Sequence, residues 1–435
     1  MLKNMKTLTR SAISAIVICI LAMLSTLILA PKAGFDNFTL SGEYSSRQFY
    51  DVDDSQWFAR YVEDAYNYGL FHGKSENFFD HSGSLTMGET ITLAARLSKI
   101  YHDGNVDFIE SSPFYAVYAD YALSRGIIDR NTDYYYDAPA TRAEFALLVY
   151  RALPTEAFPP INDIADYGIC DVAPDDSDYG GAVYALYRAG ILSGSDGYGT
   201  FAPNSGITRA QACAIAVRIA DPVMRDKLSL PSRMPAEVIF KRSMDAVFML
   251  ETFDSDGDPI RTGTGFFVSA SGLAVTNLHV LESAASATVT LFDGKVYPVS
   301  GINDISDEDD LALFSIDADL DGFPYLTLFD SDLVEAGNTV YALGNPQNLI
   351  NTITDGIISN TSRDVDGSIF IQFTAPISFG SGGSPVLNTL GQVVGVASIS
   401  FTDGQNVNFA VPVNYVKELH PGELVALDAL LVDQV

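Results

Sequence analysis

Residues 263–281 read GTGFFVSASGLAVTNLHVL and contain short apolar runs separated by glycine and serine. Similar runs recur through the second half of the chain. They cover Thr264 to Val268, Ala287 to Leu291, Leu311 to Ile316, Thr339 to Leu343, Ile369 to Phe373 and Val393 to Ala397. Short strands with Gly, Asp and Asn between them predict an all-β sandwich or barrel. About 185 residues suit a pair of small barrels.

Three chemically reactive positions lie near the ends of these runs. His279 directly follows one apolar run, and Asp310 opens another one 31 residues later. The third position is the stretch SFGSGGS at 378–384. A serine hydroxyl becomes a nucleophile when an imidazole takes its proton, and a carboxylate fixes the tautomer of that imidazole. Neighbouring glycines let backbone N–H groups converge on an oxyanion. The pattern therefore predicts acyl-transfer chemistry.

The second half of the chain resembles trypsin-like serine proteases of the HtrA-type branch. The matching strings are GTGFFV at 263–268, VTNLHV at 275–280, DLAL at 310–313, ALGNP at 342–346, TAPIS at 374–378 and NFAVP at 408–412. The resemblance implies two packed six-stranded barrels with the site in the cleft between them, and a protein or peptide substrate. It implies that His279 is the general base and Asp310 the orienting carboxylate, and it places Gly380, Gly382 and Gly383 in the oxyanion loop.

The nucleophile is where this chain departs from the family. An ungapped alignment of residues 374–388 places the family's serine on Gly382. A one-residue shift would present Ser381 instead, and Ser384 is the weaker alternative because Pro385 restricts its backbone. Two hypotheses stay open. One is a serine endopeptidase that processes or degrades envelope proteins through Ser381, and the other is an inactive pseudoprotease that binds peptides or partners.

The first half of the chain contains three repeats. Each includes a four-residue string before a helical apolar pattern: Thr86-Met87-Gly88-Glu89, Thr141-Arg142-Ala143-Glu144 and Thr208-Arg209-Ala210-Gln211. Thr followed three residues later by Glu or Gln is a capping box at the start of a helix. An earlier helical pattern in each repeat ends at Gly69, Gly126 or Gly190, which predicts a glycine C-cap. Each repeat is therefore predicted to be two helices joined by a loop.

These repeats resemble S-layer homology repeats. The third matches best, with Asp171-Val172, Gly190-Ile191 and Phe201-Ala202-Pro203 before its capping box. The resemblance implies an α-rich pseudo-trimer that binds a secondary cell-wall polymer, with Arg142 and Arg209 in the binding grooves. Met87 stands in place of the arginine in the first repeat and predicts one weakened groove. The alternative is that these arginines are surface residues at helix N-termini or pair with a nearby acid.

The N-terminus carries an export pattern. Lys3, Lys6 and Arg10 precede an uncharged apolar run of 20 residues from Ser11 to Ala30, which is long enough to span a bilayer as a helix. We therefore expect an exported protein at the bacterial cell surface or wall, either released or held by one N-terminal membrane anchor. The expected parts are a signal peptide or anchor (1–33), repeats at 48–222 (about 48–102, 112–154 and 161–222), a linker (223–237), the protease-like domain (238–423) and an apolar tail (424–435).

Composition restricts the classes of function. Hydrophobic residues make up 47% of the chain and charged residues 18%, which excludes a disordered chain. A net charge of −30 argues against binding of nucleic acid or lipid headgroups through a basic surface. The histidines other than His279 are scattered, so neither a metal nor a cofactor is expected. Outside the N-terminal run, Cys170 and Cys213 are expected to be buried thiols rather than a disulfide.

Overall fold

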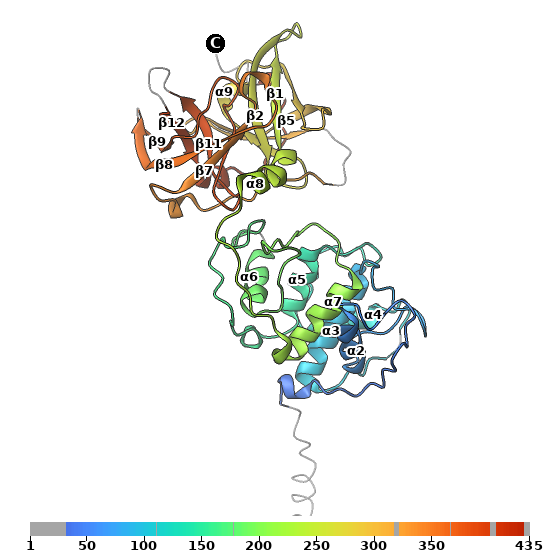
Figure 1. The fold of residues 1–435 in the computed structure, drawn as a ribbon. Helices are drawn as coiled ribbons and strands as arrows, with labels where there is room; N and C mark the ends of the chain where they lie inside the picture. Colours follow the sequence, from blue (N-terminus) through green and yellow to red (C-terminus); the bar gives the residue numbers. More distant parts are fainter. Residues whose placement is uncertain are drawn as a thin grey trace, which may run out of the picture. The chain divides into compact units, whose positions relative to one another are not determined.

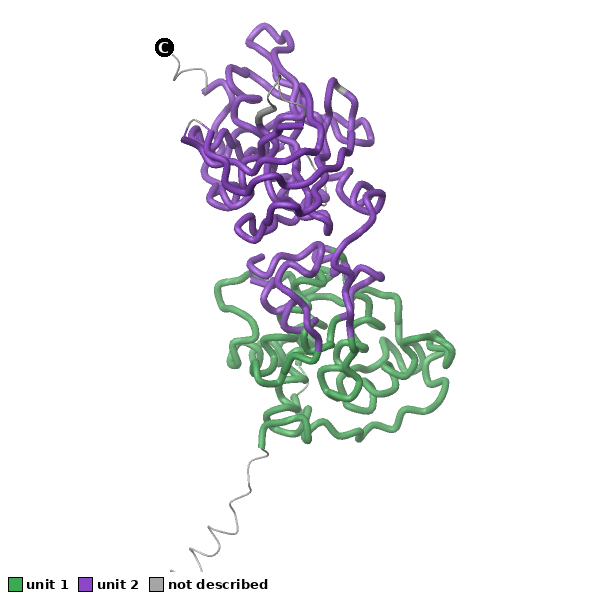
Figure 2. Tube along the Cα trace, turned by 60° about the vertical axis from the view of Figure 1, so that its left-hand side comes forward, with its two compact units in different colours: residues 1–161, 188–192, 205–227 green, residues 162–187, 193–204, 228–435 purple. Residues whose placement is uncertain are grey.

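The computed structural model of the chain describes residues 32–429, except 110, 177, 317–321, 366 and 401–405. The chain divides into two compact units, coloured separately in Figure 2. The first comprises residues 1–161, 188–192 and 205–227, and the second comprises residues 162–187, 193–204 and 228–435. The predicted export run lies outside the described residues. Within the described ranges, no helix has both the length and the hydrophobicity needed to cross a membrane.

The first unit is helical, as the repeat pattern predicts. Its elements are η1 (Phe35–Asn37), α2 (Ala59–Asn67), α3 (Met87–Asp103), α4 (Ala116–Ser124), α5 (Arg142–Arg151), η2 (Thr155–Ala157), α7 (Arg209–Ala220) and η3 (Pro222–Met224) (Figure 1). Helices α3, α5 and α7 each begin with a complete capping box, with Thr86, Thr141 and Thr208 at the N-cap. The predicted C-cap glycines have φ angles of 69° to 72°, the left-handed conformation that favours glycine.

The three loops that precede the capping boxes pair with one another. Single β-bridges join Ser84 to Thr208, Thr86 to Pro139 and Thr141 to Gly206. Each loop therefore touches both of the others. This closed ring of backbone pairing supports the expected pseudo-trimer.

The second unit contains two closed six-stranded antiparallel barrels, which confirms the predicted fold class. The first has strands β1 (Val247–Phe253), β2 (Pro259–Phe267), β3 (Leu273–Thr276), β4 (Ser286–Thr290), β5 (Val296–Ser306) and β6 (Leu311–Ile316) in the order β1-β2-β3-β6-β5-β4. The second has β7 (Thr339–Gly344), β8 (Thr352–Val365), β9 (Ser368–Phe373), β10 (Pro385–Leu387), β11 (Val393–Ser400) and β12 (Asn408–Pro412) in the order β10-β11-β12-β9-β8-β7. The helical elements of this unit are α6 (Gly180–Arg188), α8 (Ala236–Ser243), η4 (Met244–Ala246), α9 (Leu278–Leu281), η5 (Ser331–Leu333), η6 (Pro346–Asn348) and α10 (Val413–Lys417). The last residue of α6, Arg188, belongs to the first unit.

Each barrel has its own apolar core, and a third cluster joins the two. Phe248 and Phe314 lie in the core of the first barrel, and Phe373 lies in the core of the second. The shared cluster includes Phe266 from the first barrel and Val396 from the second. Packing of this kind fixes the two barrels against each other, because buried apolar area stabilises their contact by about 25 cal/mol per Å².

The C-terminal tail packs on the first barrel as far as it is described. Val425 forms an antiparallel bridge with Ile302 of β5, and Leu427 is buried among the side chains of that barrel's core. The described part of the apolar tail therefore packs against the first barrel. Residues 430–435 lie outside the described residues.

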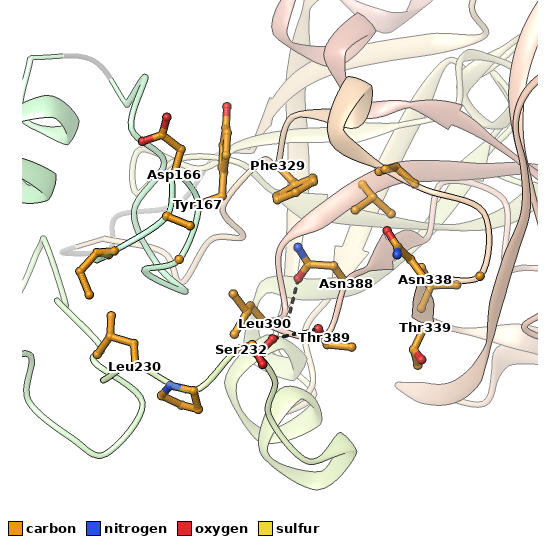
Figure 3. A pocket seen from close by; sticks show the side chains of 18 of the residues that line it. Asp166, Tyr167, Leu230, Ser232, Phe329, Asn338, Thr339, Asn388, Thr389 and Leu390 are labelled. Atoms are coloured by element: carbon orange, nitrogen blue, oxygen red, sulfur yellow. Dashed lines mark hydrogen bonds between the residues drawn. The ribbon is translucent and has the colours of Figure 1, made fainter. Parts of the chain in front are cut away.

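Residues 162–187, from the third repeat, pack on the second barrel within this unit. The buried side-chain amide of Gln392 donates to the backbone carbonyls of Tyr167 and Ile169, each at 3.1 Å. The ring of Tyr167 lies 4.9 Å from the ring of Phe329. Tyr167 and Phe329 border a cavity of about 580 Å³ that the linker segment 230–232 also lines (Figure 3).

Candidate active site

His279 lies just beyond β3, in the single-turn helix α9. The backbone N–H of Leu278 donates to the carbonyl of Asp310 at 3.1 Å. The side-chain amide of Asn277 donates to the same carbonyl at 3.0 Å. These two bonds hold the turn that carries the imidazole against the residue that precedes β6.

Three donors orient the carboxylate of Asp310. Its Oδ2 lies 2.7 Å from Nδ1 of His279 and accepts the hydroxyl of Ser398 at 3.0 Å. Its Oδ1 accepts the backbone N–H of His279 at 2.9 Å. Because a carboxylate only accepts hydrogen bonds, Nδ1 of His279 carries the proton and Nε2 is left as an acceptor. The structure thus brings the expected base and carboxylate together in the arrangement that general-base chemistry uses.

Gly382 is the residue beside the free nitrogen of the imidazole. A Cβ atom built on Gly382 would lie 3.3 Å from Nε2 of His279 and 3.6 Å from Oδ1 of Asn277. The backbone of Gly382 lies outside the positive-φ region, so an ordinary L-residue fits it without backbone strain. The position that the ungapped alignment assigns to the nucleophile is therefore the one next to His279, and it carries no hydroxyl.

The two neighbouring serine hydroxyls point elsewhere. Ser381 is only 4% exposed, and its Oγ accepts the backbone N–H of Ser378 at 3.3 Å. The Oγ of Ser384 is buried and faces Gly344, where an added Cβ would lie only 2.0 Å from it. Among the described residues, neither hydroxyl forms a hydrogen bond with the ring of His279.

Hydrogen bonds from both barrels hold the glycine loop, residues 380–383, in place. Gly380 has a φ of 88°, and its carbonyl accepts the hydroxyl of Thr264 at 2.8 Å. The carbonyl of Gly382 accepts the backbone N–H of Thr264, also at 2.8 Å. The N–H of Gly383 donates to the carbonyl of Ala397 at 2.8 Å, so this residue anchors the loop. Thr264 therefore links the first barrel to the glycine loop.

The site opens into a cavity of about 740 Å³. Its walls combine His279 and the glycine loop with the apolar side chains of Val280, Ile377 and Phe379. Phe379 is 89% exposed. A cavity with apolar walls and a few directed polar groups is typical of a site that binds a small ligand or a peptide side chain.

The two arginines expected to bind polymer are both nearly buried in the first unit. Arg209 is 4% exposed, and its Nη1 lies 3.2 Å from a carboxylate oxygen of Glu89. It also donates to the carbonyls of Phe79 and His72 at 2.9 and 2.7 Å. Arg142 is 7% exposed and donates to the side chain of Gln211 at 3.4 Å. Arg209 still borders a cavity of about 430 Å³, so part of it faces a space that a ligand can enter.

The two cysteines are free and buried, as expected. Burial raises the pKa of the Cys170 thiol to about 11 and also raises the pKa of Cys213. Both thiols therefore stay protonated at neutral pH and are poor nucleophiles.

Comparison with known proteins fits this geometry. The trypsin-like peptidase domain family matches residues 263–396, and the S-layer homology domain family matches residues 48–79 and 171–213. A probable periplasmic DegP-like serine endoprotease of Chlamydia trachomatis is 42% identical over 162 residues, which cover 36% of this chain and 32% of that protein. The chain combines S-layer homology repeats with an HtrA-type, trypsin-like serine protease domain.

Other relatives of this protease domain are similar over the same part. A putative serine protease HhoB of Synechocystis is 38% identical over 161 residues, which cover 35% of this chain and 38% of that protein. The serine endoprotease from Yersinia pestis, a solved structure, has a TM-score of 0.38 and 27% identity, and the match covers 44% of this chain and 66% of that one. The chain spans about a third of the length of the two curated relatives. Their names support the predicted class, a serine endopeptidase.

Three positioning residues were not anticipated from the sequence. Ser398 comes from β11 and Thr264 from β2. Gln347 lies in η6, and its backbone N–H donates to the carbonyl of Phe379 at 2.9 Å. The only sequence signal for Thr264 is its place in the GTGFFV string, and nothing in the local sequence of Ser398 or Gln347 marks them. Their roles depend on contacts between segments that are far apart in the chain.

Proposed function

We propose that this protein is attached to the cell wall and that its protease-type domain binds peptides in the cleft beside His279 without forming an acyl-enzyme. Gly382 is the observation that carries this proposal. It occupies the position whose Cβ would lie 3.3 Å from Nε2 of His279, where acyl transfer needs a hydroxyl. The base, its carboxylate and the cleft are retained, which supports a binding role for the same surface.

A second function is favoured by specific observations. The relatives named as serine endoproteases and the intact pair of His279 and Asp310 support an endopeptidase that processes or degrades envelope proteins. In that case the hydroxyl of Ser381 is the nucleophile. It must leave the N–H of Ser378 and turn toward the imidazole when substrate binds.

A fluorophosphonate probe separates these two functions, because it labels only an activated serine. We expect the wild-type full chain to remain unlabelled, as Ser381→Ala and Ser384→Ala do. We also expect a labelled, unfolded protein of basic net charge to bind without giving fragments. Labelling of the wild type that disappears in Ser381→Ala would overturn the binding proposal and establish the endopeptidase.

For the repeats, we propose binding of a secondary cell-wall polymer at the grooves that contain Arg142 and Arg209. The cavity beside Arg209 and the matches to the S-layer homology family support this. The test is co-sedimentation with purified cell walls, before and after chemical removal of their secondary polymers. We expect retention to fall on stripped walls and with Arg142→Ala plus Arg209→Lys, while Arg130→Ala at an exposed site is the control. Equal retention on stripped and intact walls would contradict polymer binding.

A further inference from the structure

Two backbone N–H groups in the glycine loop are available to a ligand. The carbonyl of Phe379 accepts the N–H of Gln347 at 2.9 Å, and the carbonyl of Ser381 accepts the N–H of Ser384 at 3.0 Å. The C=O and N–H of a trans peptide point in opposite directions. The N–H groups of Gly380 and Gly382 therefore point away from these bonds. Among the described residues, neither of them has a hydrogen-bond acceptor, and both glycines line the 740 Å³ cavity.

The missing side chain of Gly382 changes which chemical group fits at this point. A serine there would place its oxygen between the bound carbonyl and the imidazole of His279. Glycine leaves this space for a second ligand oxygen, since the Cβ position lies 3.3 Å from Nε2. A carboxylate has that second oxygen and an internal peptide bond does not. An imidazolium ring donates through both of its nitrogens. In that form of His279, one carboxylate oxygen of the ligand can accept from the loop N–H groups and the other from Nε2.

The surroundings limit the rest of the ligand. Ile377 and the exposed Phe379 supply apolar walls close to the loop. Residues 238–423 contain six Lys and Arg against 24 Asp and Glu, a net charge of −18. A ligand with many negative charges is therefore repelled. A single carboxylate on a neutral or basic peptide with an apolar last residue fits both conditions.

We infer that the cleft recognises the free C-terminal carboxylate of a peptide whose last residue is apolar. This rests on the proposed binding function and assigns its ligand class. Recognition of a chain end by backbone N–H groups is an established mode of peptide binding. The module would then hold the new carboxyl ends that proteolysis of envelope proteins produces.

The test compares two fluorescein-labelled peptides of sequence Gly-Ser-Lys-Ala-Ala-Val, one with a free C-terminal acid and one with a C-terminal amide. Binding to the full chain is measured by fluorescence polarisation. We expect the acid to bind about tenfold more tightly, as one charge-assisted contact supplies. Gly382→Ala places a methyl group beside Nε2, and we expect it to bring the acid-to-amide affinity ratio close to one.

Gly197→Ala is the matched control. A Cβ at Gly197 would touch no other atom within 4 Å and its φ is not positive, so the acid-to-amide ratio should stay at the wild-type value. Equal binding of acid and amide, no binding of either peptide, or a preference that survives Gly382→Ala would each overturn the inference. If the wild type also stays unlabelled by fluorophosphonate, only the carboxylate assignment has failed. If the wild type is labelled, the proposed binding function has failed with it.

Discussion

A Cβ atom on Gly382 would lie 3.3 Å from Nε2 of His279, so a serine at this position would place its hydroxyl beside the imidazole. Gly382→Ser adds a hydroxyl at a position with ordinary φ, beside an imidazole that is 45% exposed and can shift slightly. We expect the wild type to stay unlabelled by fluorophosphonate, Gly382→Ser to become labelled, and the labelling to disappear again when His279→Ala is added. Gly197→Ser is the control for an added hydroxyl elsewhere. A folded Gly382→Ser protein that stays unlabelled would contradict the position of residue 382 beside Nε2 of His279.

The role of Asp310 can be measured in the same background. Its carboxylate fixes Nδ1 of His279 as the donor, and an asparagine amide can reverse that polarity. We expect Asp310→Asn to slow labelling of the Gly382→Ser protein by on the order of 10⁴-fold. Ser398→Ala removes only one of three donors to the carboxylate and should slow labelling by about tenfold or less. A rate unaffected by Asp310→Asn would mean that the hydroxyl reacts without the base.

How much of this site can be predicted depends on how far its parts lie apart in the chain. Short local motifs contain His279, Asp310 and the glycine loop, so these parts of the site can be predicted from the sequence. The capping boxes of α3, α5 and α7 are local motifs as well. Thr264 and Ser398 act through contacts between the two barrels, and Gln347 acts through a backbone contact with Phe379. No local sequence pattern records contacts of this kind. The packing of residues 162–187 on the second barrel was also not predicted, because it depends on single contacts such as those of Gln392.

Arg209 is expected to matter for stability as well as for binding. Arg209→Ala would leave the carboxylate of Glu89 without this partner and remove the donors to the carbonyls of Phe79 and His72. Glu89 keeps its ion pair with Lys74, so the cost comes mainly from the two carbonyls that lose their donor. Each unsatisfied buried group costs about 1–3 kcal/mol. We expect Arg209→Ala to lower the thermal midpoint of the first unit by several degrees, measured by circular dichroism at 222 nm. Arg209→Lys keeps the charge and should lower it less, and an unchanged midpoint for Arg209→Ala would contradict a structural role.

The free energy of unfolding is expected to depend on pH through the carboxyl group of Asp176. Burial raises its pKa to about 6, although its carboxylate accepts the N–H of Ala173 at 2.8 Å. The folded protein therefore holds this proton up to about pH 6, whereas the unfolded chain releases it near pH 4. Because the folded state binds more protons in that interval, this residue's contribution to stability falls as pH rises from about 4 to 6 and stays low above it.

Asp176→Asn tests this sign. The amide keeps an acceptor for Ala173 and has no charge to bury. We expect it to increase the free energy of unfolding by on the order of 1 kcal/mol at pH 7.5 and to have no effect at pH 4, measured by urea denaturation. The exposed Asp178→Asn is the control and should have little effect at either pH. A stabilisation that is equal at both pH values would contradict titration of Asp176 as its cause.

The division of the third repeat between the two units has a practical consequence for dissecting this molecule. A truncated chain that starts at residue 228 contains every barrel strand but lacks the segment whose carbonyls accept the amide of Gln392. That amide would then lose both of its partners, and the apolar face around Phe329 would lose Tyr167. The barrels therefore depend on a segment of the third repeat. A fragment that keeps these contacts must begin no later than residue 162.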